Sequence, residues 1–159
     1  MKTKVLNVSY QSLSIEELSR EDKDLILRAE KQAKKAYAPY SEFYVGAAVL
    51  LENGKVFMGC NQENASYPLS LCAERVAIFA AHSQFPGIPV KKIIITAINP
   101  RKKICSPISP CGACRQVIRE SEFRFKNNIE IILKGETDKV FVFDTIKSLL
   151  PLSFDSDAL

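Results

Sequence analysis

The chain has 159 residues, enough for one compact domain that removes about two-thirds or more of its unfolded surface from water. Charged residues make up 25% and hydrophobic residues 47%, with no bias toward disordered, collagen-like or membrane-spanning proteins. The net charge of +4 is spread over short basic patches without interleaved aromatic residues. A nucleic-acid partner is therefore not expected.

The first twenty residues carry little regular pattern beyond Ser14 to Glu17, which fits a capping box at the start of a helical turn. We therefore expect an N-terminal extension over residues 1–20 and one domain over residues 21–159. Polar residues interrupt the sequence after Lys4, so it offers no continuous apolar core for a signal peptide. No apolar run approaches the roughly 20 residues that span a bilayer. We expect a cytoplasmic protein with no membrane partner.

Amphipathic periodicity starts at Asp22 and predicts a helix that ends before Pro39. Two segments rich in Val, Leu and Phe follow, at residues 43–51 and 55–60. The Asn53-Gly54 pair between them favours a tight reversal. This part of the chain therefore predicts a helix followed by a β-hairpin.

Helices and strands alternate in the rest of the chain. Expected helices cover residues 72–81 and 111–122, and expected strands cover residues 91–98, 129–133 and 139–143, with a short helix ending near residue 150. The Ile-rich segment 91–98 suits a strand that is covered on both faces. The order predicts a three-layer α/β fold, with a mixed sheet of about five strands and helices on both faces. The helices after Leu71 and Pro110 can share a face and bring their N-termini together.

Five cysteines, an odd number, argue against a disulfide framework in a chain of this size. Cys111 and Cys114 are separated by two residues behind Pro110, so the first turn of a helix places them on one face. Cys72 begins another predicted helix. Three thiolates suit zinc, and a catalytic zinc site keeps its fourth position open for water.

The fourth zinc ligand distinguishes a structural zinc site from a catalytic one. His82 lies ten residues after Cys72, about 15 Å farther along the same helix, and cannot easily complete the shell. Cys60 or Cys105 can close it, and the protein is then a non-catalytic zinc-stabilised binding module. Glu74 favours catalysis, because a carboxylate beside an open zinc position can act as general base. An acid that merely stabilises a helix N-terminus is the alternative for Glu74.

Several motifs occur together in the order of one family. The metal elements are Cys72-Ala73-Glu74 and Pro110-Cys111-x-x-Cys114, and the others are Ala38-Pro39-Tyr40-Ser41, Phe43-x-Val45-Gly46-Ala47-Ala48, Asn61-x-Glu63-Asn64-Ala65 and Leu149-Leu150-Pro151. After residue 20 the chain resembles the small homotetrameric zinc-dependent cytidine deaminases. The resemblance implies their cytidine-deaminase-like fold, one Zn²⁺ per chain and a role in pyrimidine salvage. The implied reaction hydrolyses cytidine and 2′-deoxycytidine to uridine and 2′-deoxyuridine with release of ammonia.

The resemblance also assigns roles at the metal. Cys72, Cys111 and Cys114 hold the zinc, and hydroxide held by the zinc attacks C4 of the base. Glu74 passes a proton to N3 and then to the departing amino group. Arg75 donates hydrogen bonds to the sulfurs and so offsets the negative charge of three thiolates.

The implied substrate-binding residues surround the nucleoside. Phe43 is an aromatic wall, Asn61 and Glu63 bind the ribose hydroxyls, and the backbone of Ala73 contacts the base. Phe154 matches an aromatic residue that reaches into the active site of a neighbouring subunit, which implies a homotetramer with shared sites. Tyr67 is a further candidate for a subunit interface. Pro68 departs from the family, in which small residues are common at that position.

The residue at the first position of the Cys72-Ala73-Glu74 motif differs between branches of the wider deaminase superfamily. Polynucleotide and base deaminases usually have histidine where this chain has Cys72, so a free nucleoside is the expected substrate. A modified cytosine nucleoside, such as an antibiotic of the blasticidin type, remains the nearest alternative substrate. Asn61 and Glu63 favour one that carries ribose.

Overall fold

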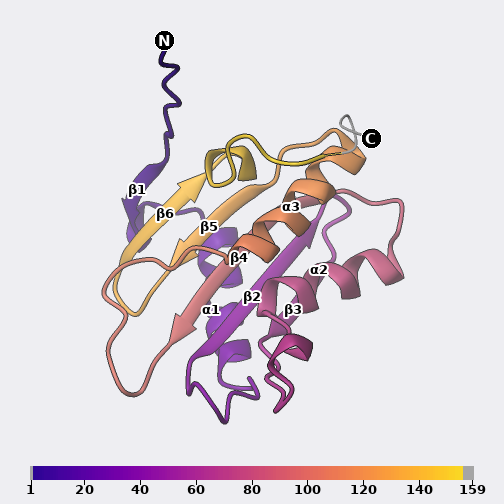
Figure 1. Ribbon diagram of the computed structural model, residues 1–159. Helices are drawn as coiled ribbons and strands as arrows, with labels where there is room; N and C mark the ends of the chain where they lie inside the picture. Colours follow the sequence, from indigo (N-terminus) through magenta and orange to yellow (C-terminus); the bar gives the residue numbers. More distant parts are fainter. Residues whose placement is uncertain (1, 156–159) are drawn as a thin grey trace.

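The computed structural model describes residues 2–155, and six strands in this part of the chain form one mixed sheet in the order β1-β6-β5-β4-β2-β3 (Figure 1). The strands are β1 (Gln11–Ser14), β2 (Tyr44–Leu51), β3 (Val56–Cys60), β4 (Val90–Ile98), β5 (Glu130–Lys134) and β6 (Lys139–Phe143). The helices are α1 (Arg20–Ala33), α2 (Ala73–Gln84) and α3 (Gly112–Phe125), and the 3-10 turns are η1 (Ile15–Glu17), η2 (Tyr67–Leu69) and η3 (Ile146–Ser148). No helix of the described residues is both long and apolar enough to cross a bilayer.

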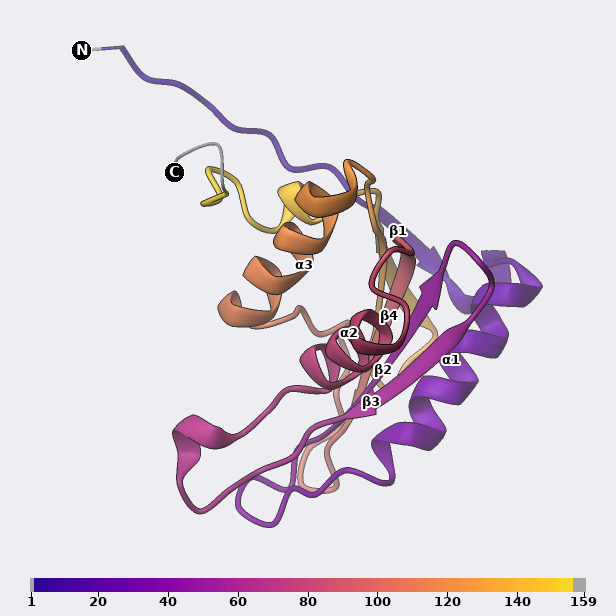
Figure 2. The same ribbon diagram turned by 90° about the vertical axis from the view of Figure 1, so that its right-hand side faces the viewer.

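The sheet is the middle layer of three. Helix α1 covers one face, and α2 and α3 cover the other (Figure 2). Both faces of the sheet are apolar, because the side chains of strand β4 alternate between two apolar clusters. Ile93 and Ile95 pack toward α2 and α3, whereas Ile94 packs toward α1. The predicted three-layer α/β fold, including a strand covered on both faces, is confirmed.

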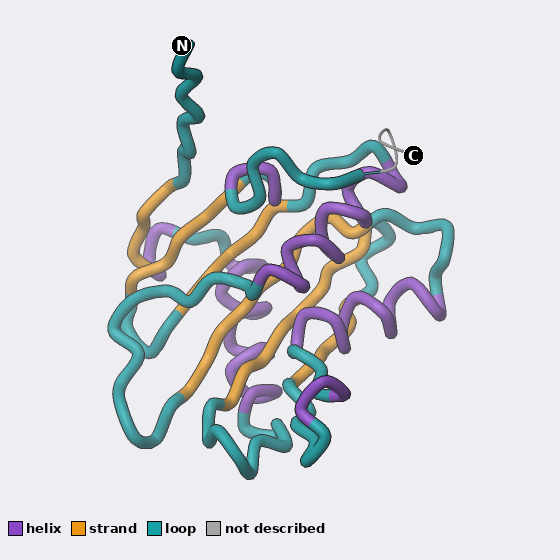
Figure 3. The backbone as a smooth tube through the Cα atoms, viewed as in Figure 1, coloured by secondary structure: helices purple, strands orange, loops and turns teal. Residues whose placement is uncertain are grey.

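The five expected strands are all present, and only β4 and β5 run parallel. Helix α3 lies in the connection between these two strands, as a parallel pair requires (Figure 3). The expected count of about five strands is one too low, because β1 pairs antiparallel with β6 at the edge of the sheet. Its sequence, Gln-Ser-Leu-Ser, lacks the apolar alternation that marks a strand.

Tertiary contacts stabilise β1. The ring of Tyr10 lies 4.8 Å from that of Phe141 and 5.1 Å from that of Phe143, measured between centroids. The capping box expected after β1 is present, and the backbone N–H of Ser14 donates to Glu17 Oε2 at 2.7 Å. Backbone pairing and these aromatic contacts thus stabilise a strand that the local sequence does not predict.

Gly59 of β3 sets the distance between the sheet and α2. A Cβ at this position would lie 2.2 Å from the carbonyl oxygen of Ala73 and 2.7 Å from the amide nitrogen of Ala77. Only glycine therefore lets the first turn of α2 pack directly on β3. The same first turn carries Glu74 and follows Cys72, so this packing also positions the site described below.

We predict that Gly59→Ala lowers the free energy of unfolding by about 3 kcal/mol, because the added methyl group must push α2 away from β3. Urea denaturation of the two proteins measures the difference. Gly87→Ala is the matched control, since nothing lies within 4 Å of a Cβ there. Equal losses of stability in the two variants would contradict this role of Gly59.

Candidate functional site

Three cysteine sulfurs gather where the N-termini of α2 and α3 meet. Cys72 is the N-cap of α2 and Cys111 is the N-cap of α3, both with extended backbone, and Cys114 lies in the first turn of α3. The Sγ atoms of Cys72 and Cys111 are 3.7 Å apart, and all three sulfurs lie within 4.8 Å of one another. Residues 39 positions apart in the sequence thus form one cluster.

The spacing of the sulfurs fits a zinc ion. Tetrahedral coordination with Zn–S bonds of about 2.3 Å places two sulfurs roughly 3.8 Å apart, close to the distance between Cys72 and Cys111. Cys111 is exposed and Cys114 is buried, so the cluster lies at the protein surface with one side open. One zinc ion per chain fits this set of donors.

Within the described residues, no other His, Cys, Asp or Glu side chain joins this cluster as a ligand. Cys60 is buried, and its sulfur accepts hydrogen bonds from the side chains of Gln32 and Gln62 at 3.6 and 3.4 Å. The thiol of Cys105 faces the carbonyl oxygen of Lys103 at 3.6 Å. Among the described residues the cluster therefore supplies three ligands, the number that catalytic zinc sites have.

The thiol of Cys72 is acidic. A hydrogen bond from the Cys114 thiol is the largest of the effects that lower the pKa of Cys72 to about 5, and Arg75 adds to it. Arg75 Nη2 lies 3.8 Å from Cys72 Sγ and also donates to the Ser70 carbonyl at 3.3 Å. The same hydrogen bond raises the pKa of Cys114, because Cys114 is the donor. The positive ends of two helix dipoles further stabilise thiolates here.

Glu74 lies beside the sulfurs, at the second position of α2, and only 4% of its surface is exposed. Burial raises the pKa of its carboxyl group above the ordinary value, and the negative charge of Cys72 raises it further. A carboxyl group with a raised pKa can hold and release a proton closer to neutral pH. Its position and its pKa therefore suit general acid–base catalysis.

A cavity of about 320 Å³ opens next to the sulfurs. Its walls come from the loop before β2, the segment between β3 and α2, and the loop before α3; they are lined by Ser41, Phe43, Val45, Asn61, Glu63, Ser70, Leu71, Cys72, Glu74, Ile108, Ser109 and Cys111. Six of the residues proposed from sequence therefore line one cavity. The sequence motifs do not include four of the lining residues: Ser70 and Leu71, which directly precede Cys72, and Ile108 and Ser109, which directly precede Pro110.

Asn61 connects β3 to the start of β2. Its side-chain amide donates to the carbonyl oxygen of Phe43 at 2.9 Å, and its Oδ1 accepts from the amide of Val45 at 2.7 Å. These two bonds use one N–H and one lone pair of the amide, leave one of each for another partner, and fix the backbone on either side of residue 44. Asn61 thereby holds the wall that carries Phe43.

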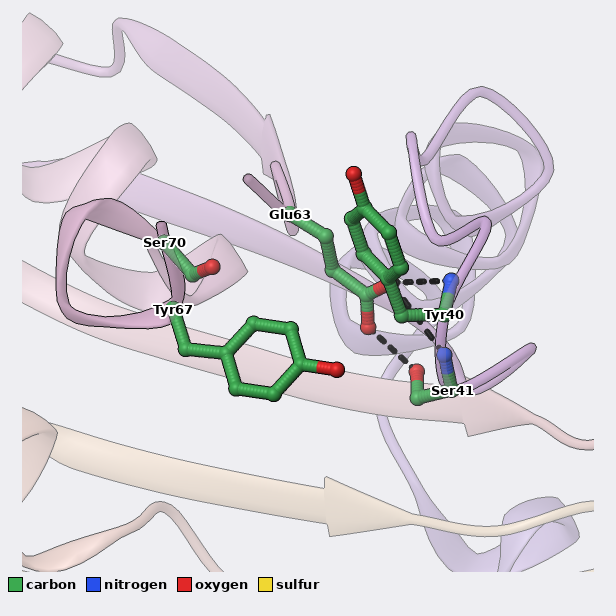
Figure 4. Close-up of a pocket in the computed structure, with 5 residues that line it drawn as sticks. All are labelled: Tyr40, Ser41, Glu63, Tyr67 and Ser70. Atoms are coloured by element: carbon green, nitrogen blue, oxygen red, sulfur yellow. Dashed lines mark hydrogen bonds between the residues drawn. The ribbon is translucent and has the colours of Figure 1, made fainter. Parts of the chain in front are cut away.

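Glu63 holds the loop before β2 in the same way. Its Oε2 accepts from the backbone amides of Tyr40 at 2.9 Å and Ser41 at 3.2 Å, and the Ser41 hydroxyl donates to Oε1 (Figure 4). Burial raises the pKa of Glu63, but these hydrogen bonds outweigh it and the net shift is downward. An ionised carboxylate therefore faces the cavity.

A second cavity, of about 400 Å³, adjoins the first and shares Ser41, Glu63 and Ser70 with it. Tyr40 and Tyr67 complete its lining, with ring centroids 5.7 Å apart in an edge-to-face arrangement (Figure 4). The Tyr67 side chain is largely exposed.

Two of the residues proposed from sequence to bind the substrate do not line the cavity beside the sulfurs. Ala73 is fully buried at the start of α2, beneath Gly59. Phe154 lies in the segment after η3, and 60% of its surface is exposed. Within one chain, Phe154 therefore makes no contribution to the wall of this cavity.

Comparison with known proteins agrees with this geometry. Residues 19–127, more than half of the chain, match the family model described as the cytidine and deoxycytidylate deaminase zinc-binding region. The chain belongs to this deaminase family. The matched residues include the three clustered cysteines, Glu74 and every residue that lines the cavity.

Relatives in the deaminase family extend over most of the chain. The cytidine deaminase of Halalkalibacterium halodurans is 46% identical over 142 residues, which cover 86% of this chain and 96% of the relative. That of Sporosarcina psychrophila is 40% identical over 139 residues, covering 85% and 92%. The crystal structure of cytidine deaminase from Burkholderia pseudomallei superposes with a TM-score of 0.72 at 41% identity, covering 86% of this chain and 100% of that one.

We predict that Cys111→Ser removes most of the zinc from the purified protein, because only two of the three thiolate ligands remain to hold the ion. Cys60→Ser and Cys105→Ser are matched controls and should retain one zinc per chain. Elemental analysis of the purified proteins gives the stoichiometry. A loss of zinc in either control as large as in Cys111→Ser would indicate a closed, four-cysteine site.

Proposed function

We propose that this protein is a zinc-dependent cytidine deaminase that hydrolyses cytidine and 2′-deoxycytidine to uridine and 2′-deoxyuridine, with release of ammonia. The observation that carries the proposal is the placement of Glu74, a buried acid, in a cavity whose wall also contains the sulfurs of Cys72 and Cys111. Membership of the deaminase family and the cytidine deaminases of 40 and 46% identity support the choice of reaction.

Glu74 moves the protons of the reaction. Zinc, when bound by the three cysteines, makes water a usable nucleophile near neutral pH. Glu74 accepts a proton from that water and delivers it to N3 of the cytosine ring, which prepares C4 for attack. The oxygen of that water bonds to C4, and Glu74 accepts the second proton of this oxygen and delivers it to the amino group on C4. The C4–N bond then breaks, ammonia leaves, and the oxygen remains on C4 as the carbonyl of uridine.

The walls of the cavity orient the nucleoside. Phe43 provides an aromatic surface, and the Ala73 backbone at the start of α2 contacts the base. Asn61 and Glu63 bind the ribose hydroxyls. Glu63 Oε1 accepts a hydrogen bond from Ser41 and, as an ionised carboxylate, retains capacity for a hydroxyl donor. This arrangement favours a nucleoside whose sugar hydroxyls are unmodified.

Arg75 offsets the negative charge of the metal site. Three thiolates exceed the charge of Zn²⁺ and oppose ionisation of a neighbouring water. The guanidinium group near Cys72 Sγ reduces the electron density on that sulfur, as do the two helix N-termini. Arg75 acts through the cysteine and does not touch the substrate.

We predict that Glu74→Gln lowers kcat for cytidine by about 10²- to 10⁴-fold, because the amide cannot carry the proton. Zinc content should stay at one per chain. The fall in ultraviolet absorbance as cytidine becomes uridine measures the rate. Glu120→Gln, an exposed acid of α3 outside the cavity, is the control and should keep full activity. An active Glu74→Gln protein would rule out the proposed proton transfer.

We also propose that the protein is a homotetramer with shared active sites, in which Phe154 enters the site of a neighbouring subunit and Tyr67 lies at a subunit interface. The exposure of both aromatic side chains in the single chain supports this assembly. Residues 21–159 form the deaminase domain, and residues 1–20 are an extension that supplies the edge strand β1. Five cysteines without a disulfide fit the reducing cytoplasm, where the enzyme serves pyrimidine salvage.

Shared sites predict complementation between two defective chains. Phe154→Ala chains keep Glu74, and Glu74→Gln chains keep Phe154, so hybrid tetramers contain some sites with both residues. Hybrids isolated through two affinity tags should exceed the Phe154→Ala protein in activity per Glu74-bearing chain, in the same ultraviolet assay. Hybrids that gain nothing would show that Phe154 does not act on a neighbouring site.

A further inference from the structure

The segment that carries Phe154 is held firmly against α3. Arg115 Nη1 donates to the Leu149 carbonyl at 2.7 Å, and Gln116 Nε2 donates to the carbonyl of Phe154 itself at 2.9 Å. Arg119, one turn farther along α3, donates from Nε to the Ser153 hydroxyl at 3.0 Å. Three side chains of one helix thus hold the segment from residue 149 to residue 154, two through backbone carbonyls and one through the Ser153 hydroxyl.

Arg119 makes the strongest of these contacts. Its Nη2 lies 2.5 Å from Asp155 Oδ2, and only 10% of the Arg119 side chain and 19% of the Asp155 side chain are exposed. Charge-assisted bonds of this kind are short and directional, and loss of one partner leaves the other charge poorly solvated. The guanidinium group therefore binds both residues that flank Phe154, Ser153 before it and Asp155 after it.

The Phe154 ring itself is left in solvent while its backbone is fixed. A fixed backbone brings no benefit to an exposed apolar ring in an isolated chain. It does lower the entropy cost of inserting that ring into another molecule, because the segment is already ordered. The arrangement is that of a pre-organised anchor for a second protein surface.

We propose that Arg119 is a positioning residue that holds Phe154 in the orientation required by the active site of a second copy of this chain. This role rests on the proposed sharing of sites, and the contacts of Arg119 with Ser153 and Asp155 are what hold the shared ring. Arg119 does not line the cavity of its own chain and lies about 12 Å along α3 from Cys111. Its effect is thus expected on the neighbouring site and not on its own.

The test uses Arg119→Met, which keeps the length of the side chain and removes its hydrogen bonds. We expect kcat/KM for cytidine to fall by about 10- to 100-fold, as in Phe154→Ala, with one zinc per chain retained. Arg119→Lys keeps the charge opposite Asp155 and should recover part of the loss. Arg124→Met is the control, because Arg124 lies on the same helix but bonds to the Pro86 carbonyl.

Hybrid tetramers separate positioning from a structural role. Arg119→Met chains should complement Glu74→Gln chains, as Phe154→Ala chains do, because the Glu74→Gln chain supplies a correctly held Phe154. Arg119→Met and Phe154→Ala chains should not complement each other, since neither presents the ring. Recovery of activity in that last hybrid, or no recovery with Glu74→Gln, would overturn the role of Arg119.

The outcomes also distinguish this inference from the proposal beneath it. If Phe154→Ala fails to complement Glu74→Gln, the sharing of sites is wrong and the role of Arg119 is wrong with it. If that pair complements and the Arg119 pair does not, only the role of Arg119 is wrong. Should Arg119→Met fail to fold, Asp155→Asn weakens the same ion pair from the other side and enters the same hybrids.

Discussion

The meeting of two helix N-termini on one face of the sheet is the constraint on which the site depends. Cys72 and Cys111 are both N-caps, and their sulfurs lie 3.7 Å apart because α2 and α3 share that face. The first turn of α3 adds Cys114, and the first turn of α2 adds Glu74. Three cysteine sulfurs, the proposed general base and the positive ends of two dipoles therefore converge through the placement of two helix N-termini.

Small and polar residues position the cavity wall relative to these helices. Because Gly59 has no Cβ, the backbone of α2 can pack directly against β3. Asn61 and Glu63, which follow β3, use side-chain hydrogen bonds to hold the loop and strand that carry Ser41 and Phe43. The residues proposed to bind ribose thus also build the wall of the site, so substitutions there will change both binding and local structure.

Much of this could be predicted from the sequence, and the limits have physical causes. Helical periodicity, the Asn53-Gly54 turn and the Ile-rich β4 are local signals, and the Cys-x-x-Cys spacing identifies a metal site. Strand β1 escaped prediction because its stability comes from pairing with β6 and from Tyr10 packing on distant rings. The bonds from Arg119 to Ser153 and Asp155 join residues more than thirty positions apart, and no local pattern marks them.

The proposed reaction requires a zinc ion with three cysteine ligands and an open position beside Glu74. X-ray absorption at the zinc edge, on the protein as purified, counts the sulfur neighbours of the metal. We expect three sulfurs at about 2.3 Å and one lighter oxygen neighbour. Four sulfurs would contradict it, since a closed shell leaves no position for the water of a hydrolase.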